Sequence, residues 1–558
     1  MKPEELFDTM SAIDDDILER SERNKVAAAP DRVLAAGETS EGETAAAKKL
    51  TDKTEDRKNR IRMIRIWSIL AVAAAILIAV AIIAPKIVER NLEKANGTPT
   101  PAVTVAAVEP GNFYGQEGTE QDKLMAKYLL AKATYPEKAD FPNFEDFVKL
   151  DGSVDFESYD SAYREWEEKA FANQAGIKQE DRVRAHSGVE ALVTAGLAQL
   201  LAGEESTNRL CSPANLYVAL AMLAETTDGN SRAQILNLLG VSDIETLRGL
   251  SDVTWNILYR NSGVMTRVLA SSLWLRDDAQ ISYIRSTIDR LADTYHASTF
   301  KGTMGSAEYD QAFQAWLNEQ TGGLLKDSVA NQNLDPKTAI ALATTIYFSA
   351  KWDAEFSESR TDKQVFHAKS GDIETDFMHQ KIDNSAYVTG DKFSAVYKYF
   401  EGGQFGNMVF FLPDEGVTAD ELLSDPQVLS IINGTLGTAR ITVINVNYSI
   451  PKFDVTSDID LSECFKKLGI TDVFSAETAD FSSIAENSGG MFLSKVDHSV
   501  RVQIDEEGVK AAAYTVMPSA GALPPSGEEV DFVLDRPFVF AIRSETGIPL
   551  FVGVVELP

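Results

Sequence analysis

The stretch PKFDVTSDIDLSECFKKLGITDVFS occupies residues 451–475, in a part of the chain that is rich in strand-like runs. ARITVINVNYSI precedes it at 439–450, and VDFVLDRPFVFAI (530–542) and LFVGVVEL (550–557) follow it. Helical patterns dominate earlier, as in GVEALVTAGLAQLLAG at 188–203. Because helices gather early and strands late, the sequence predicts an α+β domain rather than alternating βαβ units.

The composition is that of an acidic, cysteine-poor globular protein. The 558 residues carry 53 Lys and Arg against 84 Asp and Glu, a formal net charge of −31. So negative a chain lacks the positive surface that grips phosphate backbones, which excludes general nucleic-acid binding. Two cysteines, Cys211 and Cys464, are too few for a disulfide framework, and the five histidines include no H-E-x-x-H motif. We therefore expect no metal site and no cofactor.

One segment is apolar and long enough to span a membrane. Residues 66–84 read IWSILAVAAAILIAVAIIA, without a charge and with Ser68 as the polar exception. At about 1.5 Å per residue they would extend ~28 Å, about the thickness of the hydrocarbon core of a bilayer. The tail before this segment is too long for the n-region of a cleaved signal peptide. The sequence therefore predicts one uncleaved transmembrane helix.

Basic residues are concentrated before this segment. They are Lys48, Lys49, Lys53, Arg57, Lys58, Arg60, Arg62 and Arg65, against Lys86, Arg90 and Lys94 in a comparable stretch after it. An excess of Lys and Arg marks the cytoplasmic side of a membrane. We therefore expect a single-pass protein of the cell membrane, with its N-terminus in the cytoplasm and its main domain outside the cell.

These features divide the chain into five parts. Residues 1–65 are expected to be a largely disordered cytoplasmic tail, 66–84 the transmembrane helix and 85–113 a stalk. Residues 114–181 are acidic and aromatic, and are either a helical extension of the next domain or a spacer. Residues 182–558 continue without a linker-like break and form the main domain.

Six motifs follow one another along the main domain. They are NRLCSPANLYVALAMLAE (208–225), ATTIYFSAKWDAEF (343–356), FLPDEG (411–416), PKFDVTSDIDLSECFKKLGITDVFS (451–475), VDHSVRVQIDEEGVKAAAYT (496–515) and DRPFVFAI (535–542). In this order they resemble the motifs of the serpins, and the ending PLFVGVVELP also fits. The resemblance implies the serpin fold: a large, mostly antiparallel central sheet A, smaller sheets B and C, and about eight or nine helices, here preceded by the transmembrane helix. The disulfide-free domain and the long cytoplasmic tail favour a membrane-anchored member of bacterial type.

The resemblance implies a suicide inhibitor of proteases rather than an enzyme. A protease attacks an exposed reactive loop as a substrate, and the loop then inserts into sheet A as an additional strand. The protease is dragged across the inhibitor and remains trapped as the acyl-enzyme. The implied partners are serine endopeptidases, with cysteine proteases as a further class, and the serpin domain is expected to be monomeric.

The hinge of the reactive loop carries mostly small residues. The predicted hinge comprises Glu506, Glu507, Gly508, Val509, Ala511, Ala512 and Ala513. Gly508 has the conformational freedom that a bend requires. Two features depart from the family pattern, because Val-Lys follows the hinge glycine in place of Thr-Glu, and Tyr514 stands where the family has a small residue.

The loop sequence suits insertion in one register. In a strand every second side chain faces the core, so the inward set would be Val509, Ala511, Ala513, Thr515, Met517 and Ser519. The outward set would be Lys510, Ala512, Tyr514, Val516 and Pro518. A slip by one residue would bury Lys510, which costs on the order of several kcal/mol for an unpaired charge. This register favours an inhibitory serpin.

The scissile bond is located only to within a few residues. Counting forward from the hinge places it at Ala522-Leu523, whereas counting back from Pro537 places it at Ser526-Gly527. No Lys or Arg lies near either bond, so a trypsin-like pocket with a buried carboxylate would find no cation. The small residues before the first bond suit elastase-like or subtilisin-like proteases.

The resemblance also marks a polar cluster that controls the opening of the sheet. Its members would be Ser212, Asn215, Thr344 and His498, with Trp352 at the top of the sheet where the hinge enters. The family usually has Ser at the position of Asn215 and Asn at that of Thr344. Either the amide has moved across the cluster and still pairs with His498, or Asn215 is an ordinary buried polar residue.

Two other functions fit the sequence less well than inhibition. A non-inhibitory serpin would act as a binding or structural surface protein, but such members usually carry charged or bulky hinge residues where this chain has alanines at 511–513. A membrane-tethered hydrolase would need a nucleophile motif such as G-x-S-x-G, which the sequence lacks.

Overall fold

The computed structural model describes most of the chain from residue 119 onward. The described ranges are 119–149, 152–203, 206–323, 330, 332–401, 405–509 and 527–558. The expected tail, transmembrane helix (66–84) and stalk lie outside them, as do hinge residues 511–513, the candidate scissile bond at 522–523 and Ser526 of the second candidate bond. Among the described residues, no helix combines the length and apolar character needed to cross a bilayer.

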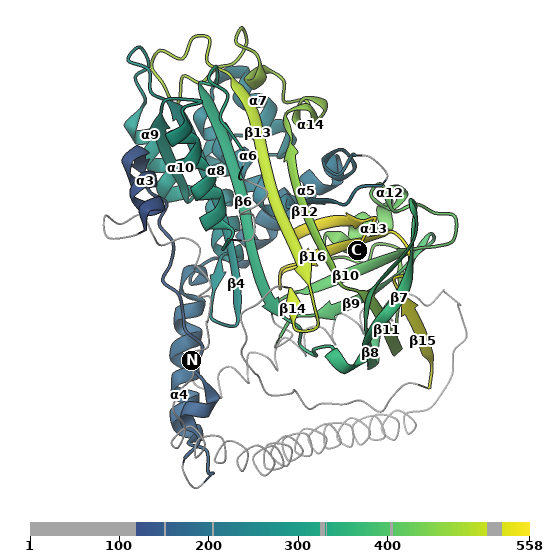
Figure 1. Cartoon of the computed structure of the whole chain (residues 1–558). Coiled ribbons are helices and arrows are strands. Elements are labelled where there is room, and N and C mark those ends of the chain that lie inside the picture. Colours follow the sequence, from purple (N-terminus) through teal and green to yellow (C-terminus); the bar gives the residue numbers. More distant parts are fainter. Residues whose placement is uncertain are drawn as a thin grey trace, which may run out of the picture. The chain divides into compact units, whose positions relative to one another are not determined.

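A large sheet, here named sheet A, dominates one side of the structure (Figure 1). Its strands in order are β1 (Leu129–Ala131), β5 (Ala297–Gly302), β4 (Met265–Arg276), β6 (Ile340–Lys351), β14 (Gly508–Val509), β13 (Leu493–Ile504) and β12 (Phe453–Asp460), and β3 (Arg260–Asn261) pairs with β4. Neighbours run antiparallel except β4 beside β5 and the direct contact of β6 with β13. Sheet A is therefore mostly antiparallel, as the resemblance implied.

A second sheet curls beside sheet A. Its path is β15 (Glu529–Val533), β11 (Arg440–Pro451), β8 (Gly371–Thr389), β9 (Phe393–Tyr399), β10 (Asn407–Pro413), β16 (Phe538–Arg543), β17 (Pro549–Val555) and β2 (Arg209–Cys211), with β7 (Thr361–Ala368) paired to β8. The expected sheets B and C are joined here, because the 19-residue β8 pairs with β11 along most of its length and with β9 at its C-terminal end.

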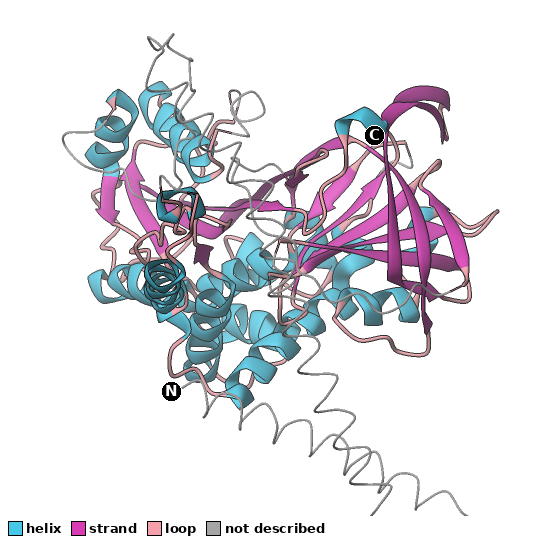
Figure 2. Cartoon of the chain, turned by 90° about the horizontal axis from the view of Figure 1, so that it is seen from below, coloured by secondary structure: helices cyan, strands magenta, loops and turns pink. Residues whose placement is uncertain are grey.

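Helices cover the sheets and line one side of the structure, as Figure 2 shows. From residue 179 onward the described α-helices are α5 (Gln179–Leu200), α6 (Pro213–Thr226), α7 (Gly229–Leu238), α8 (Ile244–Leu258), α9 (Arg285–Thr294), α10 (Ala307–Gln320), α12 (Ala419–Leu422), α13 (Pro426–Ile432) and α14 (Ser462–Lys467). Every residue of α6 is buried, in keeping with a helix that is apolar all round. Its start is set by the Ser212 cap and by Pro213 in the first turn, where a missing N–H costs nothing.

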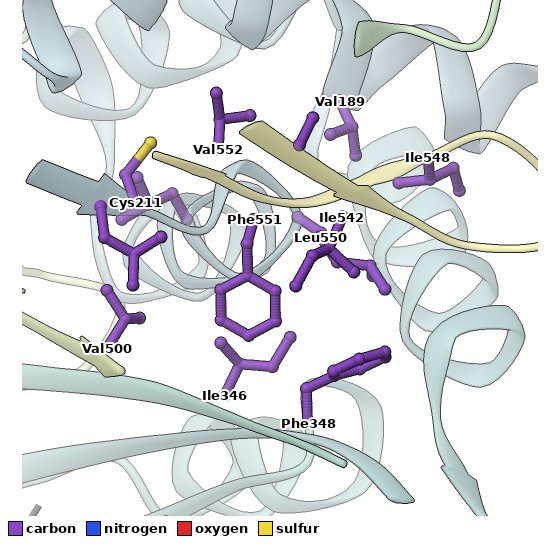
Figure 3. Packing of buried hydrophobic residues seen from close by; sticks show 14 of the residues in the cluster. Val189, Cys211, Ile346, Phe348, Val500, Ile542, Ile548, Leu550, Phe551 and Val552 are labelled. Atoms are coloured by element: carbon purple, nitrogen blue, oxygen red, sulfur yellow. The ribbon is translucent and has the colours of Figure 1, made fainter. Parts of the chain in front are cut away.

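The main core lies between sheet A and the closing strands of the second sheet. In Figure 3, Phe551 of β17 points toward Ile346 and Phe348 of β6, and the rings of Phe348 and Phe551 lie 5.9 Å apart. Val500 of β13 and Val189 of α5 complete this region, and both are fully buried. β6 therefore packs on β17, and Val500 of β13 belongs to the same buried cluster.

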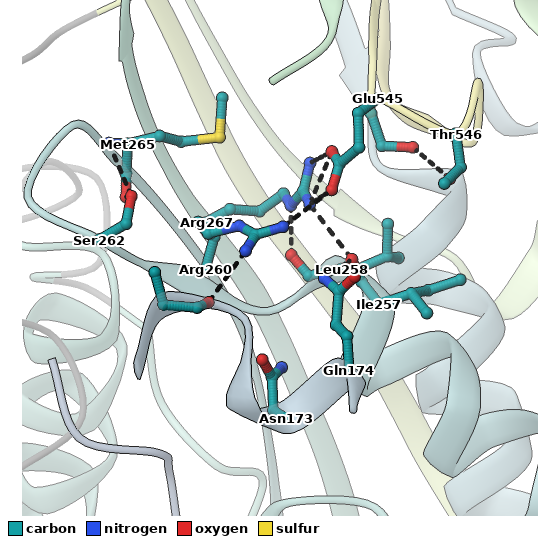
Figure 4. A network of polar contacts seen from close by, with 12 residues as sticks. Asn173, Gln174, Ile257, Leu258, Arg260, Ser262, Met265, Arg267, Glu545 and Thr546 are labelled. Carbon is teal, nitrogen blue, oxygen red and sulfur yellow. Dashed lines mark hydrogen bonds and ion pairs between the residues drawn. The ribbon is translucent and has the colours of Figure 1, made fainter. Parts of the chain in front are cut away.

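The residues before α5 also fold onto the main domain. They form α3 (Glu120–Tyr128), β1, α4 (Phe156–Ala170) and the short 3-10 turns η1 (Phe144–Phe147) and η2 (Ala172–Gln174). The buried Trp166 of α4 donates through Nε1 to the carbonyl of Ser262 at 2.8 Å. Arg260 donates to the carbonyl of Ala170 at 2.9 Å, within the polar network of Figure 4. From residue 119 on, the acidic and aromatic segment is thus packed against sheet A.

Candidate inhibitory site

The strands β6 and β13 pair directly only toward one end. The described register joins Leu493 to Ile340 and runs as far as His498 opposite Thr344. Beyond that point, residues 345–349 of β6 and 499–503 of β13 have no ladder pairing with each other among the described residues. Each strand keeps its other neighbour throughout, β4 for β6 and β12 for β13.

The two-residue strand β14 separates β6 from β13 at the opposite end. Val509 pairs with Ala350 of β6 and also with Ile504 of β13, and Gly508 pairs with Lys351. Because neighbouring strands lie about 4.8 Å apart, a strand between them sets β6 and β13 about two such spacings apart at this level. The sheet therefore has a site for one additional strand, and its first two residues are already in place.

Gly508 is required here by space. A Cβ at this position would lie 2.2 Å from the carbonyl oxygen of Ala350 and 2.8 Å from Cα of Lys351. Its backbone is not among the positive-φ glycines, so the conformational freedom expected from the sequence is not what the position uses. The corrected reason is the close approach of the hinge to β6.

Glu506 holds the hinge to two neighbouring segments. Its carboxylate accepts from Lys452 Nζ at 2.6 Å and from Thr361 Oγ1 at 2.7 Å. Burial raises the pKa of Glu506, but the hydrogen bonds from Lys452 and Thr361 outweigh it, so the pKa lies below 4.5. Neither partner of Glu506 was predicted from the sequence, although Lys452 lies in the Pro-Lys-Phe stretch at 451–453.

Trp352 sits beside the hinge, where the resemblance placed it. Its backbone N–H donates to the carbonyl of Glu507 at 2.9 Å, and its indole Nε1 donates to the carbonyl of Asp505 at 3.0 Å. The indole is buried and stacks on Phe400, with ring centroids 5.3 Å apart. These contacts fix the turn from which the reactive loop departs.

The four polar residues of the predicted cluster lie together, far from Trp352. His498 Nε2 accepts from the backbone N–H of Ser212 at 3.0 Å, and Ser212 Oγ accepts from the backbone N–H of Asn215 at 3.3 Å. His498 of β13 lies opposite Thr344 of β6, where these two strands pair directly. Trp352 follows Thr344 by eight positions, directly after the end of β6, which is roughly 25 Å along a strand. The structure therefore groups the four polar residues at one end of the contact between β6 and β13 and places Trp352 at the other end, beside the hinge.

The hydrogen bond proposed between Asn215 and His498 is not formed. The Asn215 amide, Thr344 Oγ1 and His498 Nδ1 are all buried and have no hydrogen-bond partner among the described residues. Burial lowers the pKa of His498 to about 3, so this imidazole is neutral at physiological pH. What joins the cluster instead is the backbone N–H of Ser212.

Two ionisable residues near the hinge were missed from the sequence. Lys398 of β9 is buried and donates to the carbonyl of Ala354 and to Gln380 Oε1. Burial lowers the pKa of Lys398 to about 7. Burial likewise raises the pKa of Glu401 to about 7, with repulsion from Glu355 and Asp353 partly offset by Lys351. No motif signals either residue, since their burial depends on strands far apart in sequence.

Comparison with known proteins decides the family. A family model described as serpin (serine protease inhibitor) matches residues 191–558. This chain belongs to the serpin family. Serpin-Z1C of Triticum aestivum is 30% identical to it over 371 residues, which cover 63% of this serpin and 90% of that protein. Iris of Ixodes ricinus is 28% identical over 358 residues, with 62% and 92% covered.

Solved serpin structures share the fold. The thermophilic serpin tengpin in its native state matches with a TM-score of 0.60 and 24% identity, covering 69% of this serpin and 95% of that chain. Arabidopsis AtSerpin1 in its native stressed conformation matches with a TM-score of 0.57 and 26% identity, covering 69% and 100%.

Membership in this family confirms that the protein is not an enzyme. The geometry of Ser212 and His498 agrees, because the imidazole accepts from the serine backbone N–H while the hydroxyl caps α6. A serine nucleophile would need its hydroxyl on the imidazole. Among the described residues, no group of three or more His, Cys, Asp or Glu is placed to hold a metal ion.

Proposed function

We propose that this serpin inhibits serine proteases by inserting its cleaved reactive loop between β6 and β13. The observation that carries the proposal is the position of β14, whose Val509 already pairs with both strands. Beyond it, residues 345–349 and 499–503 offer two facing strand edges without a mutual ladder. An inserted strand would add backbone hydrogen bonds to both edges, each with a net value of roughly 0.5–1.5 kcal/mol.

The proposed targets are elastase-like or subtilisin-like proteases. The loop has no Lys or Arg between Lys510 and Arg536, so it offers a trypsin-like pocket nothing to pair with. Small residues precede the candidate bond Ala522-Leu523 and suit a shallow specificity pocket. The second candidate bond, Ser526-Gly527, also joins small residues and suits the same two classes of protease.

We further propose that residues 66–84 anchor the serpin in the cell membrane with its main domain outside. Support comes from the length and apolar character of this segment and from the basic residues before it. An anchored inhibitor protects the surface beneath it, which suits a bacterial cell exposed to external proteases.

The inhibition is tested with the full-length chain in detergent. It is incubated with an elastase-like, a subtilisin-like and a trypsin-like protease, and the products are separated on denaturing gels and weighed by mass spectrometry. We expect an SDS-stable adduct with the first two proteases and a released peptide that begins at Leu523 or Gly527. Loop cleavage by the elastase-like and subtilisin-like proteases without an adduct would support the non-inhibitory alternative, and the trypsin-like protease serves as the negative control.

The anchoring has its own test. Intact cells that express the chain with an N-terminal tag are treated with a non-penetrating protease and then fractionated. The main domain should be cleaved while the tag stays protected, and the tag should remain in membranes after a carbonate wash. Release of the uncleaved chain by carbonate would contradict a transmembrane anchor.

A further inference from the structure

Residues 119–133, here named the brace, add a strand and a helix to the side of sheet A. They lie before the segment that the family model matches, which begins at 191. Within the brace, β1 pairs with the outer strand β5, Leu129 opposite Phe300 and Ala131 opposite Thr299. The backbone N–H of Ala133 donates to Ser298 Oγ at 3.1 Å, which extends the attachment beyond the strand.

The helix of the brace begins at a defined residue. Thr119 and Asp122 form a capping box, in which Thr119 Oγ1 accepts from the Asp122 N–H at 3.2 Å and Asp122 Oδ2 accepts from the Thr119 N–H at 2.6 Å. Such reciprocal caps satisfy the free donors of a first turn. The cap thereby fixes the start of α3 at Glu120.

The helix α3 packs on α10 through apolar, aromatic and charged contacts. Met125 is 1% exposed and joins the apolar cluster between α10 and sheet A, which contains Trp274, Phe300, Tyr309, Phe313 and Ala343. The rings of Tyr128 and Tyr309 lie 4.9 Å apart. Lys127 Nζ lies 2.6 Å from Glu308 Oε2 at the first turn of α10. The brace thus ties α10 to the outer edge of sheet A.

The segment that follows α10 crosses the seam between β6 and β13. Asp310 of α10 accepts from the backbone N–H of Leu334 at 3.0 Å. Gln332 then donates to Asp458 of β12, and Thr338 Oγ1 lies 2.7 Å from Ser494 Oγ of β13. A strand that enters between β6 and β13 along their whole length must break the contacts of this segment either with α10 or with β12 and β13. Any element that holds α10 on β4, β5 and β6 therefore resists that entry.

We propose that the brace restrains α10 and so sets the rate at which sheet A opens to accept a strand. This proposal rests on the proposed function, since it concerns the same insertion between β6 and β13. The restraint is a kinetic one. Contacts that must loosen on the way to the expanded sheet raise the barrier to insertion, whatever they contribute to the stability of the native state. Weakening the brace should speed insertion, and tightening it should slow insertion.

The test measures the opening of the sheet without any protease. A fluorescein-labelled peptide with the sequence of residues 509–522 is mixed with the full-length chain in detergent, and its uptake is followed by fluorescence anisotropy. Met125→Ala should speed uptake about tenfold or more, because it opens a cavity under α10. Lys127→Glu or Glu308→Lys should each speed uptake about two- to fivefold, and the double reversal should restore the parental rate.

Two controls separate the brace from general loosening. Among the described residues, Lys123 forms an ion pair with Glu120 inside α3 and not with α10. Lys123→Glu should therefore leave the rate of peptide uptake unchanged. Lys127→Cys with Glu308→Cys, joined by a short bis-maleimide in a Cys464→Ser background, should slow uptake below the parental rate. A general loss of stability cannot produce that slowing. An unchanged rate after cross-linking, or reversals that the double variant does not rescue, would overturn the proposal.

The outcomes also distinguish the brace from the inhibition itself. Peptide uptake that responds to the brace variants, in a chain that forms no protease adduct, would overturn the proposed function and leave the brace standing. If the chain forms the protease adduct but the rate of peptide uptake is the same in every brace variant, the proposed function stands and the brace proposal is overturned. A parent chain that takes up no peptide at all would overturn both.

Discussion

At the scale of single residues, the side-chain alternation that starts at Val509 decides whether the loop can become a strand. Val509 is 2% exposed. If the strand continued from it, a period of two would direct Ala511 and Ala513 to the same buried face. Ala513→Asp should therefore bury a charge at a cost of several kcal/mol, on the order given for unpaired charges, and turn the inhibitor into a substrate. Ala512→Asp, on the opposite face, should leave inhibition intact. The measurement is the number of inhibitor molecules consumed per protease trapped, and equal effects of the two variants would contradict this register.

Glu401 gives the hinge region a dependence on pH. Its pKa in the folded chain is about 7, above the ordinary 4.5, chiefly because the carboxyl is partly buried. The folded state therefore favours the protonated carboxyl, and stability is lost as pH rises from 4.5 through 7. Glu401→Gln imitates the protonated form. It should stabilise the chain by about 1–2 kcal/mol at pH 8 and change little at pH 5, after allowance for solvent screening.

Thermal unfolding at both pH values checks the Glu401 prediction. Glu415→Gln, at an exposed carboxyl in the turn after β10, serves as the control. A gain at pH 5 as large as that at pH 8 would mean that the Glu401 carboxyl does not titrate in this range.

At the scale of elements, one ion pair joins the hinge to the start of β12. Lys452 lies between β11 and β12, and its ammonium contacts the largely buried carboxylate of Glu506. Lys452→Ala should lower the free energy of unfolding by about 1–3 kcal/mol at pH 7, because Glu506 loses a charged hydrogen bond. The folded pKa of Glu506 is lowered, so this contribution is present above pH 4.5 and is lost as pH falls.

Urea unfolding between pH 7 and pH 4 checks this prediction. The difference between Lys452→Ala and the parent should shrink as the pH falls, and Lys452→Arg should retain most of the stability. A difference that stays constant over the whole range would show that Lys452 acts through packing of its stem rather than through its charge.

Sequence patterns predicted some elements well and others not at all. The apolar runs of α5, α6, β11, β16 and β17 are visible locally, and each forms the expected helix or strand. The three-residue β1 has no such signal, because its strand conformation comes from pairing with β5 about 170 residues later. The joining of two sheets through β8 was missed for the same reason. At the site, the hinge was found by motif, whereas Lys398 and Glu401 became visible only once burial was known.

At the scale of the whole molecule, a buried ionic network connects three parts of the fold. Arg260 of β3 and Arg267 of β4 are fully buried, and both contact Glu545 in the turn between β16 and β17, as drawn in Figure 4. Arg260 also donates to Ala170 at the end of α4. Burial raises the pKa of Glu545, but Arg267 and Arg260 lower it more. This network of ion pairs and hydrogen bonds therefore links the segment before α5, sheet A and the second sheet.

Removing the single acid of this network should be costly. Glu545→Gln leaves Arg260 and Arg267 without their carboxylate and should lower the free energy of unfolding by about 2–4 kcal/mol. Chemical denaturation measures the loss, with Glu415→Gln again as the exposed control. A loss no larger than that of the control would mean that the backbone carbonyls alone satisfy the two guanidinium groups.

The pairing of β2 with β17 has a consequence for synthesis of the chain. β17 is made after every other described strand, and Asn208, just before β2, accepts from the backbone N–H of Leu557, 349 residues later. At about 5–20 residues per second, translation takes tens of seconds to cover this distance. By the end of that time every described strand of sheet A has been made, and only then can the second sheet close. A ribosome that stalls between β16 and β17 would therefore hold a chain in which every described strand of sheet A has been made while β2 still lacks its partner strand.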